Sequence, residues 1–305
     1  MDHSNTGECE PGAAQPAPLV SIVMPVMNAA RTLPTTLRSI RWQTYPNWEL
    51  ILIDDGSRDA TLAMAQACAA DDSRVRVIEG GANAGLAARL NQAIALARGS
   101  YIARMDADDI AYPERLAAQV KFMLAHPECD LLGVAAVIFD DAGGLRGRFP
   151  ARRTHAEICV SPWSGFALPH PTWLGRREWF VRYGYRPDYK KTQDQDLLLR
   201  AYTESRFACL EEVLLGYRQE RRNLKKLLAG RANFARSIAR EALRQGAWGA
   251  GLAGLAEQAA KALADVLTVP LGLDRKLRGE SATAIAPADE QAWRVVWSAA
   301  NAEVG

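Results

Sequence analysis

The stretch LVSIVMPVMNAARTLPTTLRSIRWQTYPNWELILIDDGS, residues 19–57, decides the fold class. It contains two short apolar runs, at 19–26 and 49–53, and between them residues 31–43 carry apolar side chains at helical spacing. This order predicts a strand, a helix and a second strand. Because a helix connects the two strands, they are expected to lie parallel in one covered sheet.

The same alternation continues along the chain. Further strands are predicted at residues 75–78, 101–103 and 131–139, and further helices at 61–70, 86–97 and 113–125. The pattern indicates an α/β fold with a mostly parallel, Rossmann-like sheet flanked by helices. Beyond residue 140 it loosens into a hairpin at 140–149, a helix opening at 192–200 and a helical stretch from 219 to about 265.

Composition excludes several classes of protein. The net charge of +2 favours neither a nucleic acid nor an acidic partner, and no run of 18 apolar residues predicts a membrane-spanning helix. Residues 1–18 have no basic segment followed by an apolar one, so we expect a disordered tail rather than a secretion signal. The cysteines form no CxxC pair and predict reduced thiols in the cytoplasm: Cys9, Cys68, Cys129, Cys159 and Cys209.

Three carboxylates, Asp106, Asp108 and Asp109, directly follow the strand predicted at 101–103. Charges this close repel one another unless a cation binds them. Mg²⁺ and Mn²⁺ prefer such oxygen ligands and often bridge them to phosphates, so the cluster predicts a metal–diphosphate site. The alternative is a strand-to-helix turn in which Asp only caps the next helix. An EF-hand is disfavoured because its glycine and its last glutamate are missing.

Polar residues also end the first two strands. Asn28 follows the first, and Asp54 and Asp55 end the second. Because ligands bind at the carboxyl ends of parallel strands, we expect these residues and the Asp106 cluster to share one cleft. An aspartate here can accept a hydrogen bond from a nucleotide base or a sugar hydroxyl, or it can merely cap a helix.

Two further features lie in the second half. Asp194 and Asp196 open the helix predicted at 192–200 and point to different sides, so one can face a cleft while the other pairs with Arg200 at i+4. Both can also be ordinary charges at a helix N-terminus. His170 stands between two prolines and is either a structural residue or a ligand of a metal or phosphate.

Taken together, these residues resemble the family 2 glycosyltransferases, which are inverting enzymes of the GT-A fold. The resemblance rests on the stretch at 20–61, on NAGLAARLNQAIALARGSYIARMDADD with the following YPERL, on HPTWLGRREWF and on TQDQDLLLRAY. It implies a GT-A domain over residues 19–217, with a nucleotide-sugar-binding half at 19–110 and an acceptor-binding half at 111–217. Residues 218–305 would form a helical, basic C-terminal extension.

The resemblance also implies roles for single residues. Asp108 would be the main ligand of Mn²⁺ or Mg²⁺, with Asp106 near the metal or ribose, and His170 is a further candidate ligand. Asp194 matches the catalytic base. Residues that would contact the donor nucleotide, usually a uracil nucleotide, are Pro25, Val26, Asn28, Asp54 and Asp55.

Two departures from the family pattern matter. Met27 stands where the family usually has a tyrosine, and the QxxRW motif of processive synthases is missing. The resemblance therefore implies transfer of one sugar, from a UDP-sugar to a glycan or lipid-linked acceptor of a cell-surface polysaccharide. Trp163, Trp173 and Trp179 lie in the predicted acceptor half and are either sugar-stacking residues or core residues.

Two other functions are weighed against this one. A nucleotidyltransferase usually has a glycine-rich loop after its first strand, and residues 25–28 contain no glycine. A non-catalytic nucleotide-sugar-binding subunit would not need all the carboxylates that are present.

The segment 218–244 carries nine Lys/Arg against two Glu. It is either a helix that packs on the domain with a solvated charged face, or a site of peripheral attachment to anionic lipid on the inner face of the cell membrane.

Overall fold

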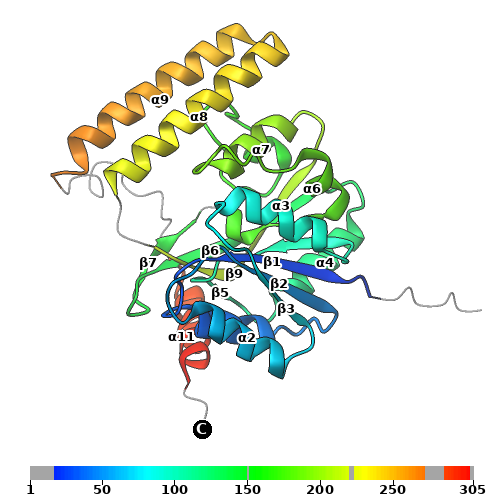
Figure 1. Ribbon diagram of the computed structural model, residues 1–305. Coiled ribbons are helices and arrows are strands. Elements are labelled where there is room, and N and C mark those ends of the chain that lie inside the picture. The colour runs from blue at the N-terminus through cyan, green and yellow to red at the C-terminus, as the bar shows by residue number, and fades with distance from the viewer. Residues whose placement is uncertain (1–16, 150, 220–222, 272–284, 303–305) are drawn as a thin grey trace, which may run out of the picture.

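The computed structural model describes residues 17–149, 151–219, 223–271 and 285–302. The predicted disordered tail at 1–18 lies outside this part of the chain except for its last two residues. The described residues form a mixed sheet with helices on both faces, a helical hairpin packed on one side, and a terminal helix packed on the other (Figure 1).

The sheet has the strand order β3-β2-β1-β4-β8-β6-β9-β5, with β7 paired to β6. Its strands are β1 (Val20–Val26), β2 (Trp48–Asp54), β3 (Val75–Glu79), β4 (Tyr101–Arg104), β5 (Ile110–Ala111), β6 (Leu131–Phe139), β7 (Leu145–Arg148), β8 (Leu174–Arg176) and β9 (Phe207–Arg218).

The predicted GT-A-like α/β architecture is confirmed, but the sheet is less parallel than expected. β1 to β4 are parallel, as is the β6–β9 pair, whereas β5, β7 and β8 pair antiparallel. β1, β2, β4 and β6 read as mostly apolar runs because both of their faces are buried. The short strand β8 inserts between β4 and β6, and no local apolar pattern announces that long-range pairing.

Helices cover both faces of this sheet. The apolar sides of α1, α2 and α4 pack in one core cluster, and those of α3, α6 and α7 pack in the other. Their bounds are α1 (Leu33–Arg41), α2 (Thr61–Asp71), α3 (Leu86–Leu96), α4 (Arg115–Ala125), α5 (His155–Ile158), α6 (Arg177–Tyr183) and α7 (Gln193–Ala201), with a 3-10 turn at His170–Thr172.

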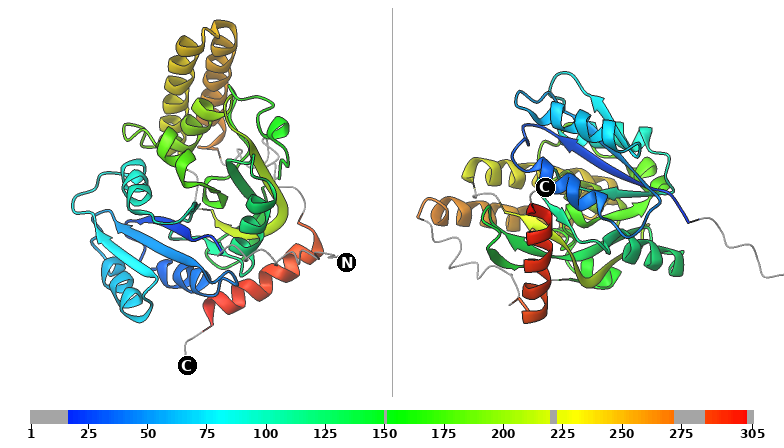
Figure 2. Two further views of the ribbon diagram at one scale, coloured as in Figure 1. Left: turned by 90° about the vertical axis from the view of Figure 1, so that its right-hand side faces the viewer. Right: turned by 90° about the horizontal axis from the view of Figure 1, so that it is seen from below.

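The long helical stretch predicted from residue 219 is two antiparallel helices, α8 (Leu224–Gln245) and α9 (Trp248–Thr268). Gly246, with a φ of 67°, adopts the left-handed conformation that ends α8. The hairpin packs through α8 on α7 and projects from the body (Figures 1 and 2). Among the described residues, no helix combines the length and the apolar character needed to cross a membrane.

The last helix, α11 (Pro287–Asn301), lies far from this hairpin and packs on the opposite side of the sheet (Figure 2). Its Trp293 is 2% exposed, stacks on Phe139 of β6 at 4.6 Å between ring centroids, and donates its indole N–H to the Gly143 carbonyl oxygen at 2.8 Å. A Cβ at Gly216 of β9 would lie 2.3 Å from the Trp293 ring, so that glycine makes room for the tryptophan.

Replacing Trp293 with alanine is expected to lower the free energy of unfolding by about 3–5 kcal/mol, the usual cost of emptying a buried tryptophan site. Thermal and urea unfolding would measure this loss. Trp248→Ala is the matched control, since that side chain is 60% exposed and should change stability little. Equal losses from both variants would contradict the assignment of Trp293 to the core.

Candidate active site

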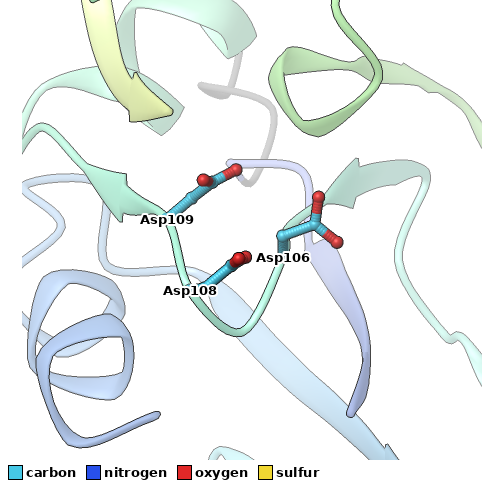
Figure 3. A group of neighbouring side chains, drawn as sticks. All are labelled: Asp106, Asp108 and Asp109. Carbon is cyan, nitrogen blue, oxygen red and sulfur yellow. The ribbon is translucent and has the colours of Figure 1, made fainter. Parts of the chain in front are cut away.

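The predicted acidic cluster lies on the loop that joins β4 to β5. Asp106, Asp108 and Asp109 each offer an oxygen, and these oxygens lie within 4.8 Å of one another (Figure 3). β4 ends in the middle of the sheet, so the loop projects from the carboxyl end of the strands, where ligands of open α/β sheets bind.

Asp109 is more than the helix-start residue that its position suggests. It is 1% exposed, and its Oδ1 accepts the backbone N–H of Arg218 at 2.8 Å, which ties the loop to the end of β9. Its Oδ2 is buried without a hydrogen-bond partner among the described residues. Burial, and then the charges of Asp108 and Asp106, raise the pKa of Asp109 well above its ordinary value.

The sequence gives no hint that Arg104 belongs to the site, because it sits in an apolar strand. The side chain is 2% exposed and forms an ion pair with Asp106. Its charge also acts on His170, whose pKa is lowered well below the ordinary value by burial and then by Arg104. Arg104 thus places a buried positive charge beneath the carboxylates.

This arrangement fits a divalent cation. Three clustered carboxylates, one of them with an unpartnered buried oxygen, form the hard oxygen-donor set that Mg²⁺ and Mn²⁺ prefer. His170 is not a member of the cluster. Its Nε2 lies 2.7 Å from the Tyr185 hydroxyl oxygen, and its ring packs edge-on to Trp173, which indicates a structural role.

The residues that end the first two strands are held by a network of short loops. Asp55 donates its backbone N–H to the Val26 carbonyl, directly after Pro25 in β1. Asn28 has a φ of 52°, a conformation that asparagine tolerates better than most residues, and its Oδ1 accepts the Arg58 N–H at 2.8 Å. Asp54 accepts the N–H groups of Gly56 and Ser57.

Asp55 is anchored by a partner that the sequence does not reveal. Its carboxylate accepts the N–H groups of Ala84 and Gly85 and forms a 2.7 Å ion pair with Arg89 of α3. Arg89 is 8% exposed and lies on the buried side of the helix. The pair fixes the Asp55 carboxylate in one orientation.

A cavity of about 420 Å³ brings residues from distant parts of the chain together. Its walls include Arg104 and Asp106 of the β4–β5 region, and His170 and Asp194 from later in the chain. Asp194 is partly exposed there, and burial by the surrounding walls raises its pKa above that of an ordinary aspartate. The cavity therefore places the predicted base on the same space as one member of the acidic cluster.

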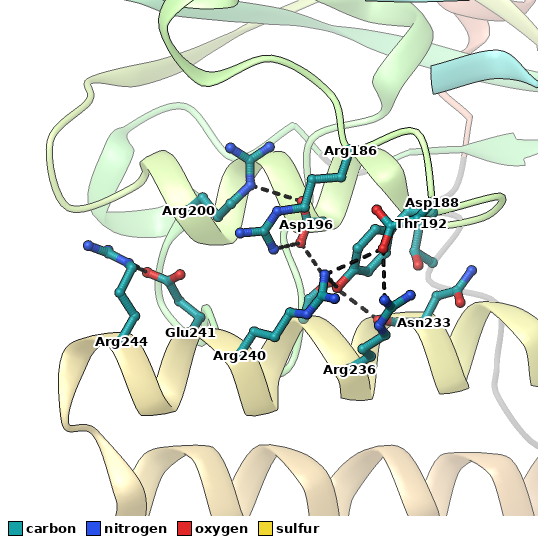
Figure 4. Close-up of polar contacts among 12 residues, drawn as sticks. Arg186, Asp188, Thr192, Asp196, Arg200, Asn233, Arg236, Arg240, Glu241 and Arg244 are labelled. Carbon is teal, nitrogen blue, oxygen red and sulfur yellow. Dashed lines mark hydrogen bonds and ion pairs between the residues drawn. The ribbon is translucent and has the colours of Figure 1, made fainter. Parts of the chain in front are cut away.

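Asp194 and Asp196 have separate surroundings, as their spacing predicts. Asp196 is 1% exposed and its carboxylate is bound by Arg186, by Arg200 at i+4 and by the Ser237 hydroxyl of α8, each at 2.8–2.9 Å (Figure 4). The i+4 ion pair is thus confirmed. Asp196 fixes α7 in place, and α7 presents Asp194 to the cavity.

A second cavity adjoins the first and shares Asp106 with it. Asp108 lines this cavity together with basic side chains, namely Lys191, Arg218 and Lys226. Cations beside a carboxylate cluster suit a ligand that carries both phosphates and a metal ion.

None of the three tryptophans of the predicted acceptor half, Trp163, Trp173 and Trp179, lines either cavity. Trp173 is fully buried and donates its indole N–H to the Leu168 carbonyl at 3.1 Å, so it is a core residue. Trp163 is half-buried and packs against Gly254 of α9. The aromatic walls of the first cavity are instead Phe149, Phe166 and Tyr217, which come from a loop region and β9 and carry no motif.

Comparisons with known proteins agree with this geometry. The model of the family described as glycosyl transferase family 2 matches residues 21–184. EpsE of Bacillus subtilis, which is named as a glycosyltransferase, is 36% identical over 67% of this chain and 74% of its own length. The Escherichia coli protein WfgD, named a UDP-Glc:alpha-D-GlcNAc-diphosphoundecaprenol beta-1,3-glucosyltransferase, is 35% identical over 44% of this chain and 51% of its own.

Solved structures share the fold at lower identity. S. aureus TarS 1–349 in complex with UDP-GlcNAc aligns with a TM-score of 0.59 and 18% identity, over 91% of this chain and 79% of that one. The mannosyltransferase PcManGT from Pyrobaculum calidifontis, in complex with GDP-Man and Mn²⁺, aligns with a TM-score of 0.59 and 18% identity. The alignment covers 93% of this chain and 86% of that one. The fold, the site and the family match lead to one conclusion: this chain is a glycosyltransferase and belongs to glycosyl transferase family 2.

Proposed function

We propose that the chain is an inverting, metal-dependent transferase that moves one sugar from a UDP-sugar to a hydroxyl group of a glycan or lipid-linked acceptor in cell-surface polysaccharide synthesis. The observation that carries the proposal is the cavity with Asp106 and Asp194 on its walls. A donor diphosphate at the acidic cluster and an acceptor hydroxyl beside Asp194 would then face each other across one sugar.

In the proposed reaction the acceptor oxygen attacks the anomeric carbon while the bond from that carbon to the diphosphate breaks. The nucleoside diphosphate leaves with the electron pair, and Asp194 takes the proton of the acceptor hydroxyl. A single displacement inverts the anomeric carbon. The raised pKa of Asp194 suits this role, because a carboxylate that binds protons more tightly is a stronger base.

The leaving diphosphate needs positive charge. A divalent cation, Mn²⁺ or Mg²⁺, held by Asp106 and Asp108 would act as a Lewis acid on it. Arg218, which lines the second cavity, is positioned to neutralise phosphate charge from the side of β9. Asp55, oriented by Arg89, would accept the imide N–H of a uracil base.

The choice of donor and acceptor follows relatives of this chain. WfgD is named for a UDP-sugar donor and a diphosphoundecaprenol acceptor, and TarS is described with UDP-GlcNAc, although PcManGT is described with GDP-Man. We propose residues 19–110 as the donor half, 111–217 as the acceptor half and 218–305 as a helical extension. The protein would work at the cytoplasmic face of the cell membrane.

A thermal-shift series tests the donor assignment. UDP-GlcNAc, UDP-glucose and GDP-mannose are added separately, each with and without Mn²⁺. A ligand at about 100 times its Kd stabilises the native state by about 2.7 kcal/mol, which corresponds to several degrees of Tm. We expect a UDP-sugar with Mn²⁺ to give the largest shift and GDP-mannose to give less. A larger Tm shift with GDP-mannose than with the UDP-sugars would contradict the proposal that the site binds uracil. A UDP-sugar shift that does not depend on Mn²⁺ would contradict the proposal that a metal ion takes part in donor binding.

A further inference from the structure

The outer helix of the projecting hairpin, α9, exposes its larger apolar residues to solvent. A helix that only packs on its own domain would bury them. Every position of α9 that is exposed holds Trp, Leu, Val, Ala or Gly. Its four fully buried residues are small or polar: Gly251, Gly254, Gln258 and Asp265. An ordinary surface helix has the reverse distribution.

The exposed apolar residues form one stripe. The larger ones are between 44% and 67% exposed: Trp248, Leu252, Leu263, Val266 and Leu267. At 100° per residue they fall within a sector of about 100°, along a helix roughly 30 Å long. Figures 1 and 2 show α9 on the far side of α8 from the sheet, so no described part of the chain covers this stripe.

The charge of the α8–α9 hairpin indicates which kind of partner covers the apolar stripe. Residues 223–271 contain seven Lys/Arg and three Asp/Glu, a net charge of +4. Two of the three carboxylates, Glu241 and Asp265, are 1% exposed and each pairs with an arginine of the hairpin, so the net positive charge comes from the remaining basic side chains. A second copy of the chain would oppose this charge with the same charge, whereas an anionic lipid surface would neutralise it.

The basic helix α8, for which the sequence leaves packing on the domain and lipid attachment as alternatives, contacts the catalytic domain. Arg236 and Arg240 both pair with Asp188 of the loop before α7, and Asn233 donates to the Lys191 carbonyl (Figure 4). α8 is therefore fixed to the catalytic domain, as the packing alternative for this segment requires. The residues 220–222 of that segment lie outside the described chain.

We infer that the stripe Trp248–Leu267 lies in the surface of an anionic phospholipid bilayer, with α9 in the membrane plane. This deepens the proposed function and rests on it for the lipid-linked acceptor. A helix with a wide apolar face and an interfacial tryptophan at one end, in a hairpin of net positive charge, binds in this way. The absence of a spanning helix among the described residues agrees with attachment at the surface.

The inner side of α9 connects this surface to the active site. Lys261 donates to the Ser164 carbonyl, Glu257 accepts the Ser164 hydroxyl, and Trp163 packs against Gly254. Phe166, two residues after Ser164, lines the cavity that holds Asp194. The Gln195 side chain of α7 accepts the backbone N–H of Phe166 at 2.7 Å. A bilayer on the outer side of α9 would thus sit behind the acceptor wall of the cavity.

Vesicle flotation tests the inference with the full chain and no donor. Vesicles of phosphatidylglycerol mixed with phosphatidylcholine are compared with vesicles of phosphatidylcholine alone. The double variant L263E/L267E removes two leucines from the stripe, each contributing about tenfold to partitioning. We expect the wild type to float with the anionic vesicles and the double variant to lose at least about tenfold in binding. Leu124→Glu on α4 is the matched control, since Leu124 is as exposed as Leu267, at 59%.

Equal binding of L263E/L267E and the wild type would overturn the inference, as would failure of the wild type to bind anionic vesicles. A wild-type dimer in light scattering that L263E/L267E converts to a monomer, without vesicle binding, would assign the stripe to a second copy instead. An assay of sugar transfer to a short soluble acceptor distinguishes a failure of the membrane inference from a failure of the proposed function. A wild-type protein that transfers sugar but does not bind anionic vesicles contradicts only the membrane surface, and one that binds the vesicles but does not transfer sugar contradicts only the proposed reaction.

Discussion

Replacing Asp194 with asparagine is expected to lower the rate of sugar transfer by about 10²–10⁴-fold, the usual contribution of a general base. Asparagine keeps the shape of the side chain but cannot take a proton. Because Asp194 lies on the cavity wall and its carboxylate accepts from the neighbouring Gln195 side chain at 3.3 Å, a contact that an amide oxygen can keep, the fold should survive. Steady-state transfer and single-turnover rates measure the effect, and donor binding should change little.

The pKa of Asp194 gives this prediction a second readout. Burial raises that pKa, and the base works only when ionised, so transfer should fall as the pH is lowered, at a pH above the ordinary aspartate value of about 3.9. An aspartate whose pKa rises on folding stabilises the folded state at low pH, and this stability is lost as the pH rises past the raised pKa. At neutral pH, D194N should therefore keep or raise the Tm.

Asp196 provides the contrast, two positions away in the same helix. Asp196→Asn removes the charge that Arg186 and Arg200 share, and breaking such a buried pair costs about 3–5 kcal/mol of stability. We expect D196N to lower the Tm and D194N to spare it. If D194N retained wild-type transfer, or lost activity only in proportion to lost folded protein, Asp194 would not be the base.

The parts of the fold that could be predicted are those encoded locally. The strands near residues 20, 50, 101 and 131 read as mostly apolar runs because both faces of the sheet are covered there. β8 and β9 could not be found this way, because their places depend on pairing with β4 and β6 across long sequence distances. α11 falls within the predicted helical extension 218–305, but its position on the sheet could not be predicted, because only the tertiary fit of Trp293 against Gly216 identifies it.

The site shows the same division. Its carboxylates stand at strand ends and helix starts, which sequence patterns locate, and two of them, Asp106 and Asp194, line one cavity. Its two buried arginines do not follow a pattern. Arg104 and Arg89 occupy positions in a strand and on a helix face where an apolar residue is expected, and only their carboxylate partners, Asp106 and Asp55, explain them. Long-range charge pairing leaves no local periodicity to detect.

Replacing Asp108 with alanine is expected to reduce transfer by roughly 10²–10³-fold, because a metal ion supplies several kcal/mol of charge stabilisation to a leaving diphosphate. Asp108 is partly exposed and lines the cavity that also holds the basic side chains of Lys191 and Arg218. Its removal takes one oxygen donor from the cluster and leaves the buried Asp109, which anchors β9, in place. The fold should therefore persist.

The decisive measurement for Asp108 is the Tm increase that Mn²⁺ adds to a UDP-sugar, because binding to the native state alone produces it. D108A should lose the part that depends on Mn²⁺ and keep the part that the nucleotide gives alone. Asp71→Ala on α2 is the matched control, since it removes an exposed carboxylate outside both cavities. A D108A protein that still gains its full Mn²⁺-dependent stability would show that the other two carboxylates hold the metal, and Asp108 would then lose its assignment as the main ligand.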